Sequence, residues 1–143
     1  MGVTCGTDIV EVGRIRKALE NKGFVQRVFT EAESDYCESR GAGKYESYAA
    51  RFAAKEAVLK ALGIGLFDGG VKLTDIEVVN GAGRQGNKGL SSAPSVVLHR
   101  EAEKLLRQKA GTSISVSLSH TKEYAIAVVV FEVSDILNSE SRK

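Results

Sequence analysis

The sequence has no tryptophan, one proline, two cysteines and almost no net charge, and each shortage excludes a class of protein. One proline excludes a proline-rich or collagen-like chain. Two cysteines without CxxC spacing give no basis for a disulfide framework or a zinc site, so we expect Cys5 and Cys37 to be buried or half-buried thiols in a reducing compartment. The net charge of +2 says little about partners, and the local distribution of charge carries more information.

Long hydrophobic runs are also missing. The longest, residues 125–131, is the size of a strand and falls far short of the roughly 18 residues that a membrane span needs. The N-terminus lacks a basic leader followed by an apolar core, so we expect no secretory signal. Gly2 is present, but position 6 is glycine rather than serine or threonine, which does not match the lipidation pattern. We therefore expect a cytoplasmic protein without a membrane partner.

The chain of 143 residues, 43% hydrophobic and 27% charged, has the composition of one globular domain. We expect this domain over residues 1–133 and a polar tail over 134–143. Periodicity predicts strands at 3–10, 73–79, 96–98, 113–119 and 124–133, and helices at 13–21, 30–40, 45–62 and 101–110. These elements do not alternate regularly as β-α-β, which predicts an α+β fold.

Short signals refine this prediction. Thr30 and Glu33 have the spacing of a helix capping box. Gly63 follows the alanine-rich helix at a normal place for a left-handed cap residue. Residues 120–123 are a short connection that predicts a hairpin between the last two strands, and residues 80–92 form a loop rich in glycine, asparagine and serine.

Glu56 lies on one stripe of helix 45–62 with Phe52, Leu59 and Lys60. Because Phe52 and Leu59 are expected in the core, Glu56 lies at the core's edge, where a carboxylate must be paired or must bind a cation. The first alternative is an i,i+4 ion pair with Lys60, worth about 0.3–0.5 kcal/mol when exposed. The second is a metal site, and the spacing alone favours the ion pair.

Asp8 lies inside an apolar strand, where aspartate is rare. It either caps the helix that begins near Gly13 or binds a metal. Two carboxylates that leave several waters in place suit Mg²⁺ bound together with a substrate phosphate. Because the sequence offers no histidine and cysteine cluster for zinc, magnesium is the expected metal if there is one.

His120 follows a serine-rich strand at the hairpin corner, where it is either a solvated turn residue or part of a phosphate-binding corner. We expect His99 to be a surface residue. A basic cluster lies on and after the first helix, and it consists of Arg14, Arg16, Lys17, Lys22 and Arg27. It is either a solvated helix face or a docking patch for an acidic protein helix. Nucleic acid is not expected, because no aromatic residues alternate with these charges.

Three segments, in order, resemble the motifs of holo-acyl-carrier-protein synthases. They are GTDIVEVGRI at residues 6–15, RFAAKEAVLKALG at residues 51–63, and SLSHT at residues 117–121 followed by Tyr124 and Ala125. The order and spacing agree, and the resemblance covers the chain up to its tail. Three ordered motifs are far more specific than any one of them.

The resemblance implies the 4′-phosphopantetheinyl transferase fold, with a small antiparallel sheet packed against a long central helix. It also implies a reaction that supports fatty acid biosynthesis. The hydroxyl of a serine in apo-acyl carrier protein attacks the β-phosphate of coenzyme A, the 4′-phosphopantetheine arm is transferred, and 3′,5′-ADP leaves. Members of this family that are as short as this chain are similar in being trimers with sites between protomers.

The resemblance also implies the site. Asp8 and Glu56 hold Mg²⁺, and Lys60 completes the catalytic group by stabilising the leaving phosphate. Either Glu56 or a metal-bound water accepts the serine proton. The positions expected to contact coenzyme A are Arg51, Lys60, Gly63, His120 and Thr121, and the carrier protein is expected to dock on Arg14 and Lys17.

One segment departs from the family pattern. The loop 80–92 is longer than the family's usual turn, and Ala93-Pro94 stands where a Gly-Lys/Arg-Pro step is common. This leaves open the local strand boundary and one coenzyme or protomer contact. Two other hypotheses compete with the transferase. One is a non-catalytic module that binds coenzyme A or a nucleotide. The other is a basic adaptor that docks an acidic protein, with Asp8 and Glu56 structural.

Overall fold

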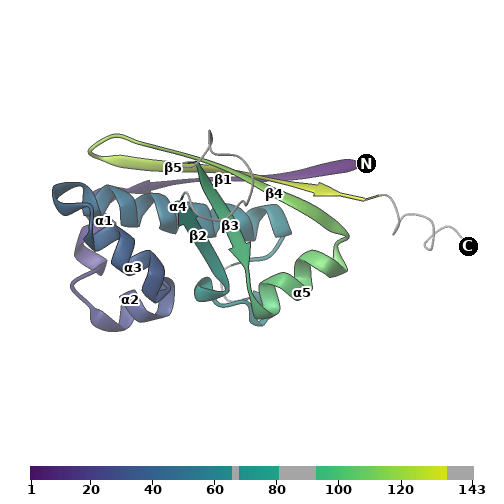
Figure 1. Cartoon of the computed structure of the whole chain (residues 1–143), viewed down its shortest axis with the longest axis horizontal. Helices are drawn as coiled ribbons and strands as arrows, with labels where there is room; N and C mark the ends of the chain where they lie inside the picture. Colours follow the sequence, from purple (N-terminus) through teal and green to yellow (C-terminus); the bar gives the residue numbers. More distant parts are fainter. Residues whose placement is uncertain (66–67, 81–92, 135–143) are drawn as a thin grey trace, which may run out of the picture.

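The α+β architecture predicted from the sequence is confirmed by a computed structural model, which describes residues 1–65, 68–80 and 93–134 (Figure 1). Its strands are β1 (Gly2–Glu11), β2 (Ile76–Asn80), β3 (Pro94–Leu98), β4 (Gly111–His120) and β5 (Tyr124–Val133). Its helices are α1 (Val12–Ala18), α2 (Lys22–Val28), α3 (Glu31–Glu38), α4 (Lys44–Leu62) and α5 (Arg100–Gln108). No helix of the described ranges is long and apolar enough to cross a membrane.

Two antiparallel sheets organise the fold. The larger has the strand order β1-β5-β4, and the smaller pairs β2 with β3. In the larger sheet Asp8 lies opposite Ala127, and His120 lies opposite Ala125 in the predicted hairpin. The long helix α4 runs along one face of this sheet (Figure 1). Its small side chains form the contact, and Ala53, Ala54 and Ala57 are fully buried.

Gly6 sets the distance between β1 and α4. A Cβ atom at this position would lie 2.0 Å from the Ala57 carbonyl oxygen, which is far inside van der Waals contact. Only glycine therefore allows the strand and the helix to approach this closely. The consequence reaches beyond packing, because Asp8 is two residues further along the strand and Glu56 precedes Ala57. Gly6 thus helps to bring the two carboxylates to one place.

The other face of the larger sheet is here called the outer sheet face, and it is apolar along β1 and β5. Its exposed large hydrophobic residues are Val3, Ile9, Tyr124, Ile126 and Val128, with exposed fractions between 39% for Ile126 and 69% for Val3. In the described part of the chain, the helices all lie on the opposite side of the sheet (Figure 1). Contiguous apolar surface of this kind marks an interaction site in a folded protein.

The two cysteines differ. Cys37 is fully buried, and burial raises the pKa of its thiol to about 12. Cys5 is exposed, so the expectation that both thiols are buried or half-buried is wrong for this residue. The reason is the alternation of β1, which turns Gly6 toward α4 and Cys5 toward the outer sheet face.

Some predicted boundaries are also wrong. Residues 73–75 form a 3-10 turn rather than the start of a strand, because Asp75 accepts the backbone N–H of Lys72 and closes a turn there. Helix α2 was not predicted at all. Strand β3 begins at Pro94, two residues earlier than expected, and α5 covers residues 100–108 rather than 101–110. The predicted tail from residue 135 on and the loop residues 81–92 lie outside the described residues.

A buried ion pair joins α3, α4 and β2. The Lys55 ammonium lies 2.7 Å from Glu33 Oε1, and neither side chain is exposed to solvent. Lys55 also donates to the carbonyl oxygens of Leu73 and Ile76. Glu33 accepts the backbone N–H of Thr30, which confirms the predicted capping box, and that of Val78 in β2. Burial lowers the pKa of Lys55, since the charged form loses its water, and Glu33 opposes this shift.

Candidate functional site

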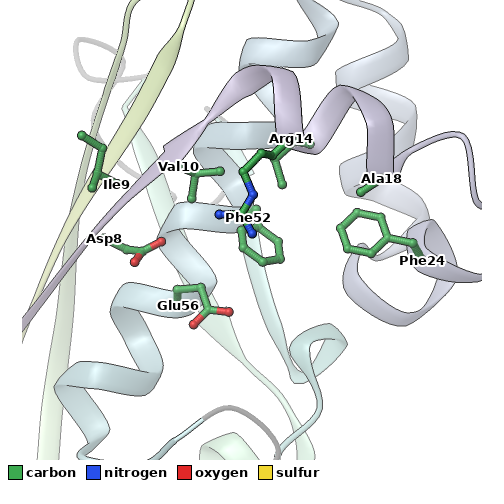
Figure 2. A pocket seen from close by; sticks show the side chains of 9 residues that line it. Asp8, Ile9, Val10, Arg14, Ala18, Phe24, Phe52 and Glu56 are labelled. Carbon is green, nitrogen blue, oxygen red and sulfur yellow. The ribbon is translucent and has the colours of Figure 1, made fainter.

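A pocket of about 380 Å³ lies where β1, α1, α2 and α4 meet. Its lining residues are Asp8, Ile9, Val10, Arg14, Ile15, Ala18, Phe24, Phe52 and Glu56. Figure 2 shows Asp8 and Glu56 directing their carboxylates toward the same space from β1 and α4, with Arg14 reaching toward them from α1. The pocket therefore has an acidic end and an apolar end.

Asp8 is held by Lys60. The Lys60 ammonium donates to Asp8 Oδ1 at 3.1 Å and to the Thr7 carbonyl oxygen at 3.0 Å. The Asp8 side chain is 17% exposed and that of Lys60 is 55% exposed. The alternative in which Asp8 caps a helix is wrong, because α1 begins after Glu11 without a side-chain cap. Lys60 thus links α4 to β1, rather than forming only an ion pair within α4.

Glu56 is half-buried beside Asp8. Burial raises the pKa of Glu56, the nearby Asp8 charge raises it further, and Lys60 partly offsets both. Two carboxylates that disfavour each other's charge are stabilised by a cation between them. Their hard oxygen atoms fit Mg²⁺. The described residues contain no group of three or more histidine, cysteine, aspartate or glutamate side chains placed to hold a metal. A cation held by Asp8 and Glu56 alone would keep ligand positions for water and substrate.

Arg14 brings a positive charge from α1 to the same pocket. Lys17 lies one turn further along α1 and is exposed. Arg16 lies between them in the sequence. Its guanidinium packs over the Tyr45 ring, 4.7 Å from the ring centre. Arg14 therefore lies at the pocket and Lys17 lies on exposed surface one turn away, and their role toward a carrier protein stays a prediction.

Comparisons of the whole chain with known proteins identify its family. The family model of the 4′-phosphopantetheinyl transferase superfamily matches residues 4–129. The chain belongs to this superfamily. It is a transferase of the phosphopantetheinyl transferase family, as the resemblance of its three motifs implied.

Curated relatives cover nearly the full length of this transferase. It is 45% identical over 137 residues to a holo-[acyl-carrier-protein] synthase of Ruminiclostridium cellulolyticum, covering 94% of this chain and 96% of that protein. It is 46% identical over 129 residues to the synthase of the same name from Cytophaga hutchinsonii, covering 88% of this chain and 94% of that protein.

Solved structures match the fold. A holo-(acyl-carrier-protein) synthase of Bacillus anthracis in complex with CoA (3′,5′-ADP) superposes with a TM-score of 0.69 at 34% identity, covering 92% of this chain and 96% of that one. The Helicobacter pylori synthase in complex with coenzyme A gives a TM-score of 0.71 at 30% identity, covering 90% and 99% of the two chains. The expected transferase fold, with its small antiparallel sheet against a long helix, is confirmed.

Four other predicted coenzyme positions of this transferase do not line the pocket within one chain. His120 and Thr121 are exposed at the hairpin end, where Thr121 Oγ1 accepts the Tyr124 backbone N–H at 3.0 Å. Gly63 caps α4 with φ of 72°, as predicted. Arg51 is 3% exposed, lies 4.1 Å from the Tyr36 ring and donates to Asn80 Oδ1 at 2.8 Å. Their roles toward coenzyme A stay predictions.

The apolar end of the pocket contains residues that sequence reasoning missed. Phe24 and Phe52 face each other there with ring centroids 6.1 Å apart. Phe52 was expected in the core because of its stripe on α4, but it is only half-buried. Phe24 belongs to α2, the helix that was not predicted. Its spacing from Val28, preceded by the capping residue Asn21, is the signal that would have found this helix.

Proposed function

We propose that this transferase is a holo-[acyl-carrier-protein] synthase that moves 4′-phosphopantetheine from coenzyme A to a serine of apo-acyl carrier protein. The reaction requires Mg²⁺, releases 3′,5′-ADP and supports fatty acid biosynthesis in the cytoplasm. The observation that carries the proposal is the pair Asp8 and Glu56, which share one pocket with Arg14 while Lys60 reaches Asp8 from the next turn of α4. The names of the full-length relatives support the carrier protein as substrate.

The reaction forms one bond and breaks one. The serine oxygen bonds to the β-phosphorus of coenzyme A, and the bond from that phosphorus to the oxygen bridging toward the 3′,5′-ADP group breaks. When bound, Mg²⁺ would neutralise negative charge on the phosphates of coenzyme A. Asp8 and Glu56 hold the cation, and Lys60 places its ammonium where the leaving phosphate gains charge. The serine proton goes to Glu56 or to a water held in the pocket.

We also propose that the working enzyme is a homotrimer with sites between protomers. The outer sheet face supports this, because exposed valine, isoleucine and tyrosine side chains on the paired strands β1 and β5 need a cover. Ile9 lies on this face and also lines the pocket, so a neighbour packed there would reach the pocket's edge. The exposed residues His120 and Thr121 would contact coenzyme A in a neighbour's site, and Arg51 and Gly63 would contact it from their own chain.

Val128→Lys is expected to separate the trimer into monomers and to abolish transfer, because it puts a charge on the outer sheet face. Val97→Lys is a matched control, since both valines are 42% exposed but Val97 lies on β3. Analytical ultracentrifugation measures the mass of each variant. If Val128→Lys keeps the assembly of the unmodified protein, the outer sheet face is not the interface.

Lys17→Glu is expected to raise the KM for apo-carrier protein by about tenfold, equivalent to roughly 1.4 kcal/mol, because it reverses a charge on the proposed docking surface. The KM for coenzyme A is expected to stay unchanged. Lys109→Glu, an exposed charge reversal after α5, is the control. Steady-state kinetics at several salt concentrations test this, and equal effects of the two variants would contradict docking on α1.

The proposed function itself is tested by mass spectrometry of a carrier protein incubated with the enzyme, coenzyme A and Mg²⁺. The expected result is a gain of one phosphopantetheine that a chelator prevents. Coenzyme binding without any gain in mass on several bacterial-type carriers would favour the non-catalytic binding module. Carrier binding that needs neither coenzyme nor metal, again without transfer, would favour the basic adaptor.

A further inference from the structure

The Lys60 ammonium uses the same carboxylate that the proposed cation needs. It donates to Asp8 Oδ1 at 3.1 Å, and it has a second acceptor in the Thr7 carbonyl oxygen at 3.0 Å. These two oxygens belong to consecutive residues of β1. The ammonium therefore has one acceptor that a divalent cation would take and one that it would leave free.

We infer that Lys60 and the divalent cation exchange on Asp8, so that arrival of the cation moves the ammonium off the carboxylate while the Thr7 carbonyl keeps it beside the pocket. This inference rests on the proposed function, because it takes Asp8 as a metal ligand. It goes further in giving Lys60 a second position and a reason to move.

Electrostatics favours the exchange. Carboxylate oxygens bind Mg²⁺ at about 2.0–2.1 Å, so a cation on Asp8 lies within a few ångströms of an ammonium on the same group. Two positive charges at such a distance in a half-buried pocket repel each other strongly. The Lys60 side chain is 55% exposed, so its stem is free to take another rotamer. Asp8 is only 17% exposed and stays on its strand.

Arrival of the cation changes the charge of the pocket. Asp8, Glu56, Lys60 and Arg14 together carry a formal charge of zero, and a divalent cation brings this to +2. The pocket then attracts a diphosphate group much more strongly. At the same moment the displaced ammonium has lost its carboxylate partner and is available to a phosphate oxygen. Lys60 is thus the counter-ion of Asp8 before the metal binds. After the metal binds, its ammonium is free to contact the substrate phosphate.

The first test measures Mn²⁺ affinity, using electron paramagnetic resonance of the free ion at fixed ionic strength. Lys60→Met removes the competitor and is expected to tighten Mn²⁺ binding by up to about fivefold, the range measured for breaking partly exposed ion pairs. Arg14→Gln removes one positive charge from the same pocket without touching the Asp8–Lys60 contact, so it is expected to tighten binding less. Equal tightening by both variants, or none by Lys60→Met, would overturn the exchange.

The second test follows the lysine itself by NMR of protein carrying ¹³Cε-labelled lysine. The Lys60 signal, assigned from Lys60→Met, is expected to shift as Mg²⁺ is added, with the midpoint of metal binding. Lys104 is the internal control, because its ammonium lies 3.0 Å from Glu101 in an exposed pair on α5. A silent Lys60 signal while Mg²⁺ binds would sink the exchange alone. Mn²⁺ affinity that is unchanged in Asp8→Asn would instead sink the proposed metal site, and the exchange with it.

Discussion

Asp8→Asn and Glu56→Gln are each expected to lower Mg²⁺-dependent transfer by roughly a thousandfold, because several kcal/mol of charge stabilisation depend on the cation they hold. Each substitution keeps the size of the side chain and removes its charge. Asp8 lies on β1 and Glu56 lies on α4, so the loss of either carboxylate leaves a single protein ligand for the cation. Calorimetry with Mn²⁺ is expected to record the loss of metal binding in parallel with the loss of turnover.

Stability separates this effect from misfolding. Partial burial and the neighbouring Asp8 charge raise the pKa of Glu56, so its negative charge disfavours the folded state above that pKa. In the presence of a chelator, Glu56→Gln is therefore expected to melt at the same temperature as the unmodified protein or higher. Calorimetric scans check this, and Glu101→Gln on α5, which loses only an exposed pair with Lys104, serves as a control that leaves transfer unchanged. Full turnover in both Asp8→Asn and Glu56→Gln would refute the metal assignment.

The carboxylate pair was predictable because each member violated a local rule. Asp8 interrupts an apolar strand, and Glu56 lies at the edge of a core-facing stripe. The three ordered motifs then assigned both to one site. Their meeting in space depends on Gly6, whose missing side chain allows β1 and α4 to touch. Sequence periodicity gives no measure of that distance, so the pocket itself had to come from the structure.

The contacts that cross between elements were not predictable. The i,i+4 spacing pointed Lys60 to Glu56, but the lysine reaches Asp8, which is 52 residues away in the chain. The apolar run at residues 73–79 suggested one strand, and the turn closed by Asp75 shortens it. Glu33 was recognised from its capping spacing, yet nothing in the sequence indicated that the same carboxylate also serves Lys55 and β2. Local rules find single residues, whereas tertiary partners decide what those residues do.

Lys55→Met is expected to lower the free energy of unfolding by about 3–5 kcal/mol, the cost of removing one partner from a buried ion pair. Glu33 would remain fully buried without its cation, among groups that donate only backbone N–H bonds. Lys44→Met is the matched control on the same helix, because Lys44 pairs with Glu38 at 3.2 Å where both side chains are partly exposed. It is expected to cost less than about 1 kcal/mol.

The pH dependence of this deficit identifies its cause. A carboxylate buried without a partner has a raised pKa, and a group of this kind contributes stability below its unfolded pKa that is lost as the pH rises through the folded one. The difference between Lys55→Met and the unmodified protein is therefore expected to be small in acid and to grow toward neutral pH. The double variant Lys55→Met/Glu33→Gln has no buried charge to titrate. Its loss of unfolding free energy relative to the unmodified protein is therefore expected to be the same in acid and at neutral pH. Urea unfolding at several pH values measures all three proteins. A deficit of Lys55→Met that does not change with pH would mean that lost packing, rather than the stranded Glu33 charge, destabilises the fold.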